Sequence, residues 1–147
     1  MTEQVKIKRL HPGAKLPTYG SAAAAGADLY ACIEAPLTVA PGETVLVPTG
    51  IALALPSGTV GLIFARSGLA TKRGLAPANK VGVIDADYRG EVMVALHNHG
   101  AAPGTVEVGE RIAQLAILPY ITADFLEADE LDETARGAGG FGSTGRQ

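Results

Sequence analysis

The sequence predicts an all-β fold, a sandwich or barrel of short antiparallel strands with one short helix. Three observations predict it. Short runs rich in Val, Ile and Leu recur along the chain, glycine and proline separate them, and helical periodicity is nearly absent. The 147 residues suffice for one domain with its own core.

The expected strands follow one another at regular intervals. They cover residues 5–8, 44–47, 50–55, 60–65, 81–84, 91–97, 105–108 and 111–118. Turn residues bound most of them, as at Ala40-Pro41-Gly42, Pro48-Thr49-Gly50, Pro56-Ser57-Gly58 and Pro103-Gly104. The stretch Asp85 to Gly90 predicts a hairpin turn, with 81–84 and 91–97 as its two paired strands.

Two stretches depart from the strand pattern. Residues 67–72 predict one helical turn, with Ser67 capping the first free backbone N–H groups. Residues 21–25 are small, but Gly20 and Gly26 bracket them closely, which predicts a loop rather than a helix.

The C-terminal segment has a different composition. Residues 124–133 hold six acidic side chains, and five glycines fall among the last eleven residues, where Phe141 is the only large apolar side chain. Such a segment cannot bury enough surface to offset its ordering entropy. We therefore expect a β domain over residues 1–135 and a flexible glycine-rich segment over residues 136–147.

Charge and composition exclude several classes of function. The net charge of −3 argues against binding a nucleic-acid polymer, although a small anion needs only a few cations and backbone N–H groups. The sequence contains no run of 18 apolar residues, so we expect no membrane-spanning helix. Residues 1–9 do not have the pattern of a secretory signal. The single cysteine, Cys32, forms no internal disulfide. We expect a cytoplasmic protein.

Five clusters of polar residues and glycines interrupt the apolar pattern. In the first, Asp28 follows Gly26-Ala27 and suits either a hydrated Mg²⁺ or a hydrogen bond to its own turn. In the second, Arg66-Ser67-Gly68 follows a strand at a helix start. It suits either phosphate binding or a simple helix cap beside a solvated arginine.

The third and fourth clusters suggest catalysis and substrate recognition. Asp85 at a strand end suits the orientation of a water molecule, Tyr88 suits stacking on a sugar, and Asn79 suits hydrogen bonds to a base edge. The alternative is an ordinary turn that favours Asp and Gly. Gln114 either reaches a phosphate or a water from its strand, or faces solvent.

The fifth cluster is the glycine-rich segment after Arg136. Glycines allow close approach to an anion, and Phe141 suits stacking on a base. Composition alone favours a disordered tail instead. No Gly-Lys-Ser/Thr follows, so this is not a Walker-type phosphate loop.

Taken together, the order and spacing of the five clusters resemble the five motifs of the homotrimeric dUTPase family. The matching segments are Ala25-Gly26-Ala27-Asp28-Leu29, Arg66-Ser67-Gly68-Leu69-Ala70, the ten residues 82–91, the seven residues 109–115 and the ten residues 136–145. The resemblance implies a jelly-roll-like fold and a homotrimer with shared active sites. It also implies Mg²⁺-dependent hydrolysis of dUTP to dUMP and pyrophosphate, which keeps uracil out of DNA and supplies dUMP for dTMP synthesis.

The resemblance also implies a role for each motif residue. Asp85 holds the attacking water and contacts the sugar 3′-hydroxyl, and Gln114 reaches the α-phosphate. Tyr88 packs under the deoxyribose and excludes a 2′-hydroxyl. The uracil is framed by Asn79, by backbone groups of Val83, Ile84 and Asp85, and by the nearby Met93, in a hairpin too narrow for the methyl group of thymine. The phosphates are bound by Arg66, Ser67 and Gly68, and Mg²⁺ is held through water by Asp28.

In the same resemblance the tail, residues 136–147, closes over the nucleotide as a lid. Arg136, Ser143 and Thr144 meet the γ-phosphate, and Phe141 covers the uracil. Two rival interpretations remain. A dCTP deaminase shares the fold and a related third motif, but its relatives lack the Arg-Gly-rich tail. A non-catalytic nucleotide sensor conflicts with the presence of Asp85, Gln114 and the tail motif.

Overall fold

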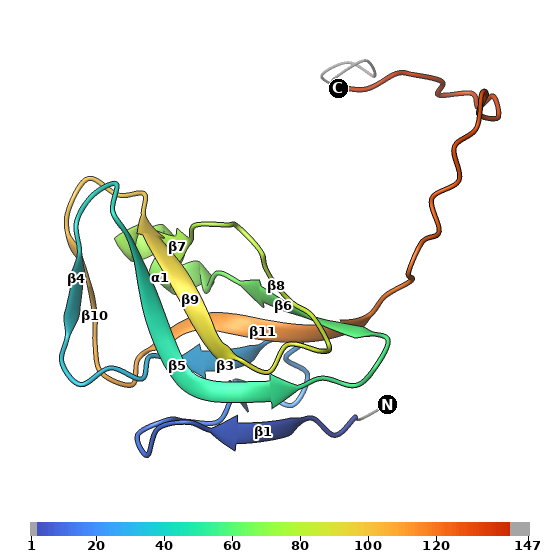
Figure 1. Cartoon of the computed structure of the whole chain (residues 1–147). Helices are drawn as coiled ribbons and strands as arrows, with labels where there is room; N and C mark the ends of the chain where they lie inside the picture. The colour runs from blue at the N-terminus through green and yellow to red at the C-terminus, as the bar shows by residue number, and fades with distance from the viewer. Residues whose placement is uncertain (1–2, 142–147) are drawn as a thin grey trace.

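The computed structural model describes residues 3–141, and it is built from antiparallel sheets (Figure 1). The strands are β1 (Lys6–Arg9), β2 (Thr18–Tyr19), β3 (Ala27–Tyr30), β4 (Leu37–Val39), β5 (Thr44–Ala54), β6 (Thr59–Phe64), β7 (Leu75–Pro77), β8 (Gly82–Ile84), β9 (Glu91–Asn98), β10 (Gly104–Val106) and β11 (Arg111–Pro119). They form a four-stranded sheet in the order β1-β5-β9-β7, a five-stranded sheet in the order β2-β3-β11-β6-β8, and the pair β10-β4.

The hydrophobic core contains side chains from all three sheets. On β9, Val92, Val94 and Leu96 are buried at alternate positions, as expected when one face of a strand is turned inward. Leu29 from β3 and Ile112 from β11 are also almost fully buried in this core. The all-β antiparallel prediction is confirmed, and within residues 3–141 the sheets form no closed barrel.

The predicted turn at Pro48-Thr49-Gly50 is wrong, because β5 runs through it as one strand of 11 residues. The register with β9 shifts between Pro48 and Ala52, and Gly50 has a left-handed φ of 69°. Such a bulge keeps the strand continuous while changing its direction. The hydroxyl of Thr49 donates to the carbonyl of Val92 at 2.5 Å, so the polar groups of the bulge are satisfied.

The predicted hairpin between 81–84 and 91–97 is also wrong. Strand β8 pairs with β6 in the five-stranded sheet, whereas β9 pairs with β5 and β7 in the other sheet. The turn itself is present, since the backbone N–H of Tyr88 donates to the carbonyl of Asp85 at 3.1 Å. The segment 85–90 therefore crosses between sheets, which an Asp- and Gly-rich turn signal cannot distinguish from a hairpin.

The helix α1 (Ser67–Arg73) confirms the predicted helical turn, but its cap differs. Arg66 is the N-cap residue, no side chain caps the helix start, and Ser67 is the first helical residue. Gly74 ends the helix in the left-handed conformation, as is common at helix C-termini. Across residues 3–141, no helix has the length and apolar character needed to span a membrane.

Four short strands were not predicted from the pattern of apolar runs. β2, β3, β4 and β7 hold two to four residues each, too few for a clear alternation. β3 carries the buried Asp28, and β7 ends at Pro77, both of which reduce the strand signal. Residues 21–25 form no helix or strand, which confirms the predicted loop.

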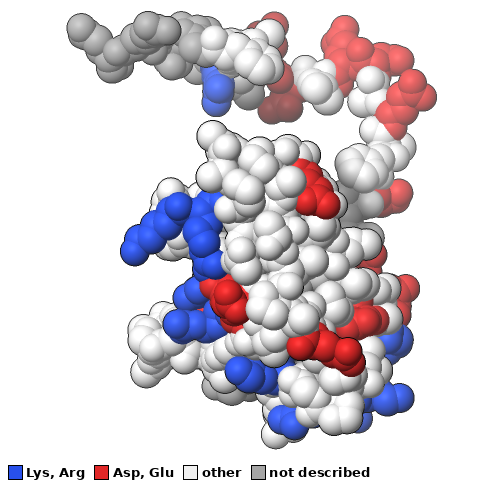
Figure 2. Space-filling view, turned by 90° about the vertical axis from the view of Figure 1, so that its left-hand side faces the viewer, with Lys and Arg blue, Asp and Glu red and all other residues white. Residues whose placement is uncertain are grey.

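After β11 the chain leaves the domain as an extended segment (Figure 1). Its apolar side chains are almost fully exposed, with Ile121 at 94% and Phe125 at 93%. Figure 2 shows acidic side chains concentrated along this segment, which stands away from the domain.

An ion pair joins α1 to the loop before β11. Arg73 donates to both carboxylate oxygens of Glu110 and to the carbonyl of Thr105. Burial raises the pKa of Glu110, but the hydrogen bonds from Arg73 and from the Glu107 backbone, with the charges of Arg73 and Arg66, outweigh it. The pKa of Glu110 therefore lies below its ordinary value of 4.5.

We expect Glu110→Gln to lower the free energy of unfolding by up to about 1 kcal/mol at pH 7, the scale of a partly exposed ion pair. Because folding depresses this pKa, the stabilisation is complete above pH 4.5 and disappears as the pH falls through the lower folded value. Urea titrations from pH 7 to pH 3 measure this, with the exposed Glu34→Gln as control. A variant deficit that persists unchanged at pH 3 would contradict the assignment.

Candidate active site

A buried carboxylate connects the first two sequence clusters. Asp28 on β3 is only 8% exposed, and its Oδ1 accepts a hydrogen bond from Nε of Arg66 at 2.9 Å. Its Oδ2 accepts from a terminal nitrogen of Arg111 at 3.2 Å. The alternative in which Asp28 bonds its own turn is not what the structure shows. Both carboxylate oxygens are instead used to hold arginines.

Gln114 brings the fourth cluster to the same place. It lies on β11 between Asp28 on β3 and Phe64 on β6, with which it is in register. Its side-chain amide is half-buried, and Nε2 donates to the carbonyl of Ala65 at 2.8 Å, one residue before Arg66. The side chain therefore contacts the segment of the second cluster rather than facing solvent.

These side chains line a pocket of about 210 Å³. Its lining residues are Gly20, Ala24, Gly26, Asp28, Arg66, Ser67, Gly68 and Gln114. Asp28 and Arg66 line it, and Arg111 pairs with the same carboxylate from outside the lining, so Asp28 and its two partners carry a net positive charge. The backbone N–H groups at the start of a helix have no intrahelical acceptors, and here they belong to Ser67 and Gly68. Cations with free backbone donors favour an oxyanion such as a phosphate.

The third cluster lies elsewhere on the same sheet. Gly61 of β6 is in register with both Ile84 and Ile117, and Ile117 is three residues past Gln114 on β11. The backbones of Ile84 and Gln114 are therefore separated by roughly 10 Å along the strands and by roughly 10 Å across two strand spacings, or roughly 14 Å in all. Asp85 follows Ile84 and continues away from Gln114. The two predicted catalytic residues are therefore not brought together within one chain.

The residues predicted to frame a base are divided between the two large sheets. Asn79 is exposed beyond β7, Val83 is 63% exposed on β8, and Met93 is 40% exposed on β9. Ile84 is buried in the core, so only its backbone is suited to contact a ligand. Tyr88 is exposed, and its hydroxyl donates to the carbonyl of Glu91 at 2.9 Å, which fixes the ring over the turn.

Arg136 and Phe141, the predicted tail contacts that the structure describes, do not line the pocket. Nε of Arg136 donates to the carbonyl of Gly139 at 2.9 Å, so this guanidinium folds back on its own segment. Phe141 is fully exposed. Ser143 and Thr144 lie outside the described residues.

Arg111 contacts the site residue Asp28, although the sequence analysis assigned Arg111 no role. It stands in the fourth cluster, three residues before Gln114, and a register shift follows it on β11. Alternation along a strand does not predict the direction of a side chain next to such an irregularity. Its partner Asp28 is 83 residues away in the sequence, so no local spacing could indicate the pair.

The pocket suits a divalent cation that keeps its water ligands better than one coordinated directly by several side chains. Among residues 3–141, no three His, Cys, Asp or Glu side chains converge to hold a metal ion. Asp28 accepts one hydrogen bond on each oxygen, which leaves lone pairs for a metal-bound water. Mg²⁺ usually keeps several waters and binds through one or two carboxylates plus substrate phosphates.

Comparisons with known proteins identify the same family throughout. The family model described as dUTPase matches residues 13–145. A deoxyuridine 5′-triphosphate nucleotidohydrolase from Desulfitobacterium hafniense is 53% identical over 146 residues, covering 96% of this chain and 97% of the relative. The enzyme of the same name from Aeromonas salmonicida is 46% identical over the full length of both chains.

A solved structure is similar over almost the whole fold. The dUTPase of Staphylococcus bacteriophage 80alpha, a G164S variant with the dUTP analogue dUpNHpp, superposes with a TM-score of 0.90 at 27% identity. The match covers 99% of this chain and all of the phage chain.

We expect Asp28→Asn to lower the free energy of unfolding by about 1–3 kcal/mol, because two arginines lose a charged acceptor that is mostly buried. Urea unfolding at pH 7 measures the loss. Asp124→Asn makes the same change at an exposed position, where the effect should stay within about 0.5 kcal/mol. Equal stability of the two variants would show that the arginines do not depend on Asp28.

Proposed function

The chain belongs to the dUTPase family and hydrolyses dUTP, and we propose that the pocket around Asp28, Arg66 and Gln114 holds its triphosphate. The observation that carries this proposal is the convergence of three sequence motifs, 28, 66–68 and 114, on one small cationic pocket. Phosphoryl transfer depends mainly on positioning and on neutralising charge, and this pocket offers both.

On the phosphate side, Arg66 uses Nε for Asp28, which leaves its terminal nitrogens available for other acceptors. One of them already contacts the carbonyl of Arg111 at 3.4 Å, a weak bond that a phosphate oxygen can replace. Ser67 and Gly68 add backbone donors. Mg²⁺ bound through water at Asp28 would neutralise further charge on the triphosphate.

On the nucleoside side, we assign Asp85 to the attacking water and the sugar 3′-hydroxyl. An exposed carboxylate at the end of β8 is well placed to accept a proton from water. Tyr88, held by Glu91, would pack under the deoxyribose and exclude a 2′-hydroxyl. Asn79, Met93 and the backbone of Val83 and Ile84 would frame a uracil and exclude the thymine methyl group.

We further propose that the active sites are shared between copies in a homotrimer. The backbone of Asp85 lies roughly 14 Å or more from that of Gln114, as the sheet register requires. That separation favours a site in which Asp85 and Gln114 come from different copies. A second copy that presents its segment 79–93 to this pocket would bring water, phosphate and Gln114 together.

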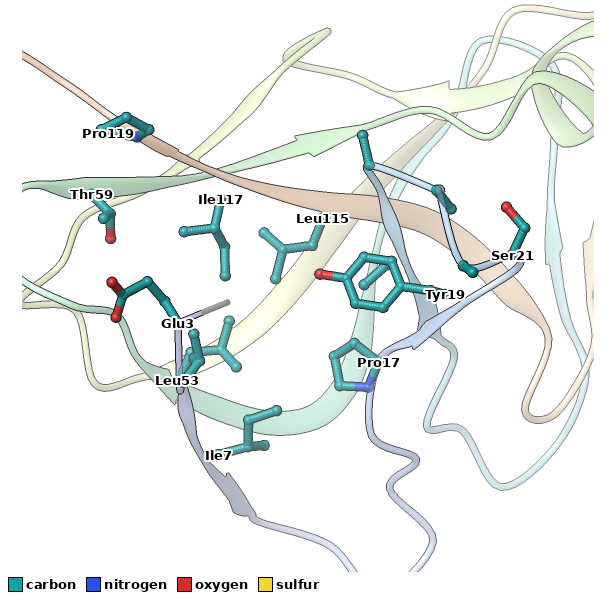
Figure 3. Close-up of a pocket in the computed structure, with 15 residues that line it drawn as sticks. Glu3, Ile7, Pro17, Tyr19, Ser21, Leu53, Thr59, Leu115, Ile117 and Pro119 are labelled. Atoms are coloured by element: carbon teal, nitrogen blue, oxygen red, sulfur yellow. The ribbon is translucent and has the colours of Figure 1, made fainter. Parts of the chain in front are cut away.

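A groove on the domain supports self-association. It measures about 790 Å³ and opens between β1 and β5 on one side and β11 on the other (Figure 3). Ile7 and Leu53 face Leu115 and Ile117 across it. An apolar groove of this size favours an apolar partner, and the exposed apolar side chains that follow β11 offer one from another copy.

The tail, residues 136–147, would then serve as a lid that closes over bound nucleotide. Its glycines allow close approach to the γ-phosphate, with Arg136, Ser143 and Thr144 as contacts and Phe141 over the base. We place the enzyme in the cytoplasm, with dUTP as its ligand and neither nucleic-acid polymers nor membranes as partners.

Turnover by an Asp85→Asn variant tests the proposed role of Asp85 in holding the attacking water. We expect dUMP formation to fall by at least about 100-fold, because an amide does not accept a proton from water. The affinity for dUpNHpp should stay within a factor of a few, since most contacts are on the phosphates. Chromatography of dUMP and calorimetry of dUpNHpp binding measure the two quantities.

The neighbouring Asp87→Asn is the matched control, and we expect near-normal turnover from it because Asp87 has no assigned role. The same assays include dCTP as substrate. Ammonia release from dCTP without dUMP formation from dUTP would contradict the proposed function. Near-normal turnover by Asp85→Asn would show that another group orients the water.

Mixed trimers test whether the sites are shared. Asp85→Asn and Gln114→Ala should each be strongly impaired alone. Their equimolar co-refolded mixture should recover about a quarter of the sites, because random association pairs an intact Asp85 from one chain with an intact Gln114 from another at that frequency. Mixing Asp85→Asn with Asp85→Ala is the control and should recover nothing. No recovery in the first mixture would show that each site is built from a single chain.

A further inference from the structure

The backbone conformation at Gly26 does not by itself require a glycine. Its φ lies outside the left-handed region, in contrast to Gly50 at 69°. A Cβ atom at position 26 would instead lie 2.4 Å from Oε1 of Gln114, 3.1 Å from its Cδ and 3.2 Å from its Cβ. Non-bonded carbon and oxygen atoms do not approach to 2.4 Å, so an alanine here requires the Gln114 side chain to move.

The Gln114 amide is consequently fixed from two sides. Nε2 is held by the carbonyl of Ala65 at 2.8 Å, and Oε1 lies over the Cα of Gly26. The first contact belongs to the end of β6 and the second to the residue before β3. The amide therefore fits one position between the segments next to the two strands that flank β11, and Gly26 and Gln114 both line the triphosphate pocket.

Gly104 gives a useful contrast. A Cβ there would meet three atoms of Leu75 at 3.0–3.1 Å, inside the hydrophobic core. That neighbour belongs to the fold and lies outside the pocket. At Gly26 the nearest atom is the polar end of a side chain with rotatable bonds, which can move at little cost to folding. The requirement for glycine at position 26 therefore comes from the site.

We propose that Gly26 is a positioning residue for the hydrolysis, because its missing side chain lets the Gln114 amide lie where it meets the substrate. This inference rests on the proposed role of Gln114 at the α-phosphate. A methyl group at position 26 displaces Oε1 by an ångström or more and weakens the bond to Ala65. Misplacement on the order of 1 Å can cost about 100-fold in rate.

The test is a double-variant cycle of Gly26→Ala and Gln114→Ala, with kcat, KM for dUTP and melting temperature measured for all four proteins. We expect Gly26→Ala to lower kcat about 10- to 100-fold with KM changed by less than about threefold. Its melting temperature should fall by less than about 4 °C. In the Gln114→Ala background the same substitution should lower kcat no further, because the group it displaces is already gone.

Gly104→Ala serves as the control for a glycine that the core requires. It should lower the melting temperature more than Gly26→Ala does, while kcat stays near normal at temperatures where the protein is folded. If Gly26→Ala is itself strongly destabilised, the melting temperature of the double variant shows whether the clash involves the Gln114 side chain. Recovery of stability when Gln114 is truncated locates the clash at that side chain, and persistent instability overturns the proposal.

The remaining outcomes separate two failures. Normal turnover by Gln114→Ala would contradict the proposed role of Gln114 in the hydrolysis, and the role of Gly26 would then have no basis. A strong loss in Gln114→Ala with normal turnover in Gly26→Ala would overturn the positioning role alone. Losses in kcat that multiply in the double variant would also overturn it, because they would show that Gly26 acts through another contact.

Discussion

The candidate site depends on the pairing of one buried carboxylate with two arginines. A charge as buried as Asp28 is tolerated only when it is paired and hydrogen-bonded. Arg66 and Arg111 meet that requirement from the end of β6 and from the start of β11. These ion pairs thereby link β3 to the start of β11 and to the segment that follows β6. The pocket, its positive balance and the position of Gln114 all follow from this arrangement.

The sequence predicted the family and the fold class better than the layout of the site. The order of the five motifs indicated the family, and the comparisons confirm it. The antiparallel all-β class and most long strands were also predictable, because alternation of apolar residues reports which face of a strand is buried. Alternation does not report which sheet a strand joins, so the segment from Asp85 to Gly90 resembled a hairpin and is a crossing.

The errors share a physical cause, since each depends on contacts that are distant in the sequence. Pro48-Thr49-Gly50 has the composition of a turn, but the Thr49 hydroxyl and the backbone of Gly50 find acceptors on β9 and the strand continues. Ser67 is a good cap by type, yet Arg66 is the N-cap residue and Ser67 is the first residue of the helix. The role of Arg111 likewise depends on a partner in another strand.

The acidic segment after β11 has a consequence for the charge of the whole molecule. Residues 120–147 hold six of the fifteen acidic side chains and only two of the twelve basic ones. Residues 1–119 therefore carry ten Lys and Arg against nine Asp and Glu, which is close to electroneutrality. Proteins near zero net charge tend to associate and precipitate. The segment thus carries the net negative charge of the molecule, and we expect it to favour colloidal repulsion between copies, an effect separate from any part that its glycines play.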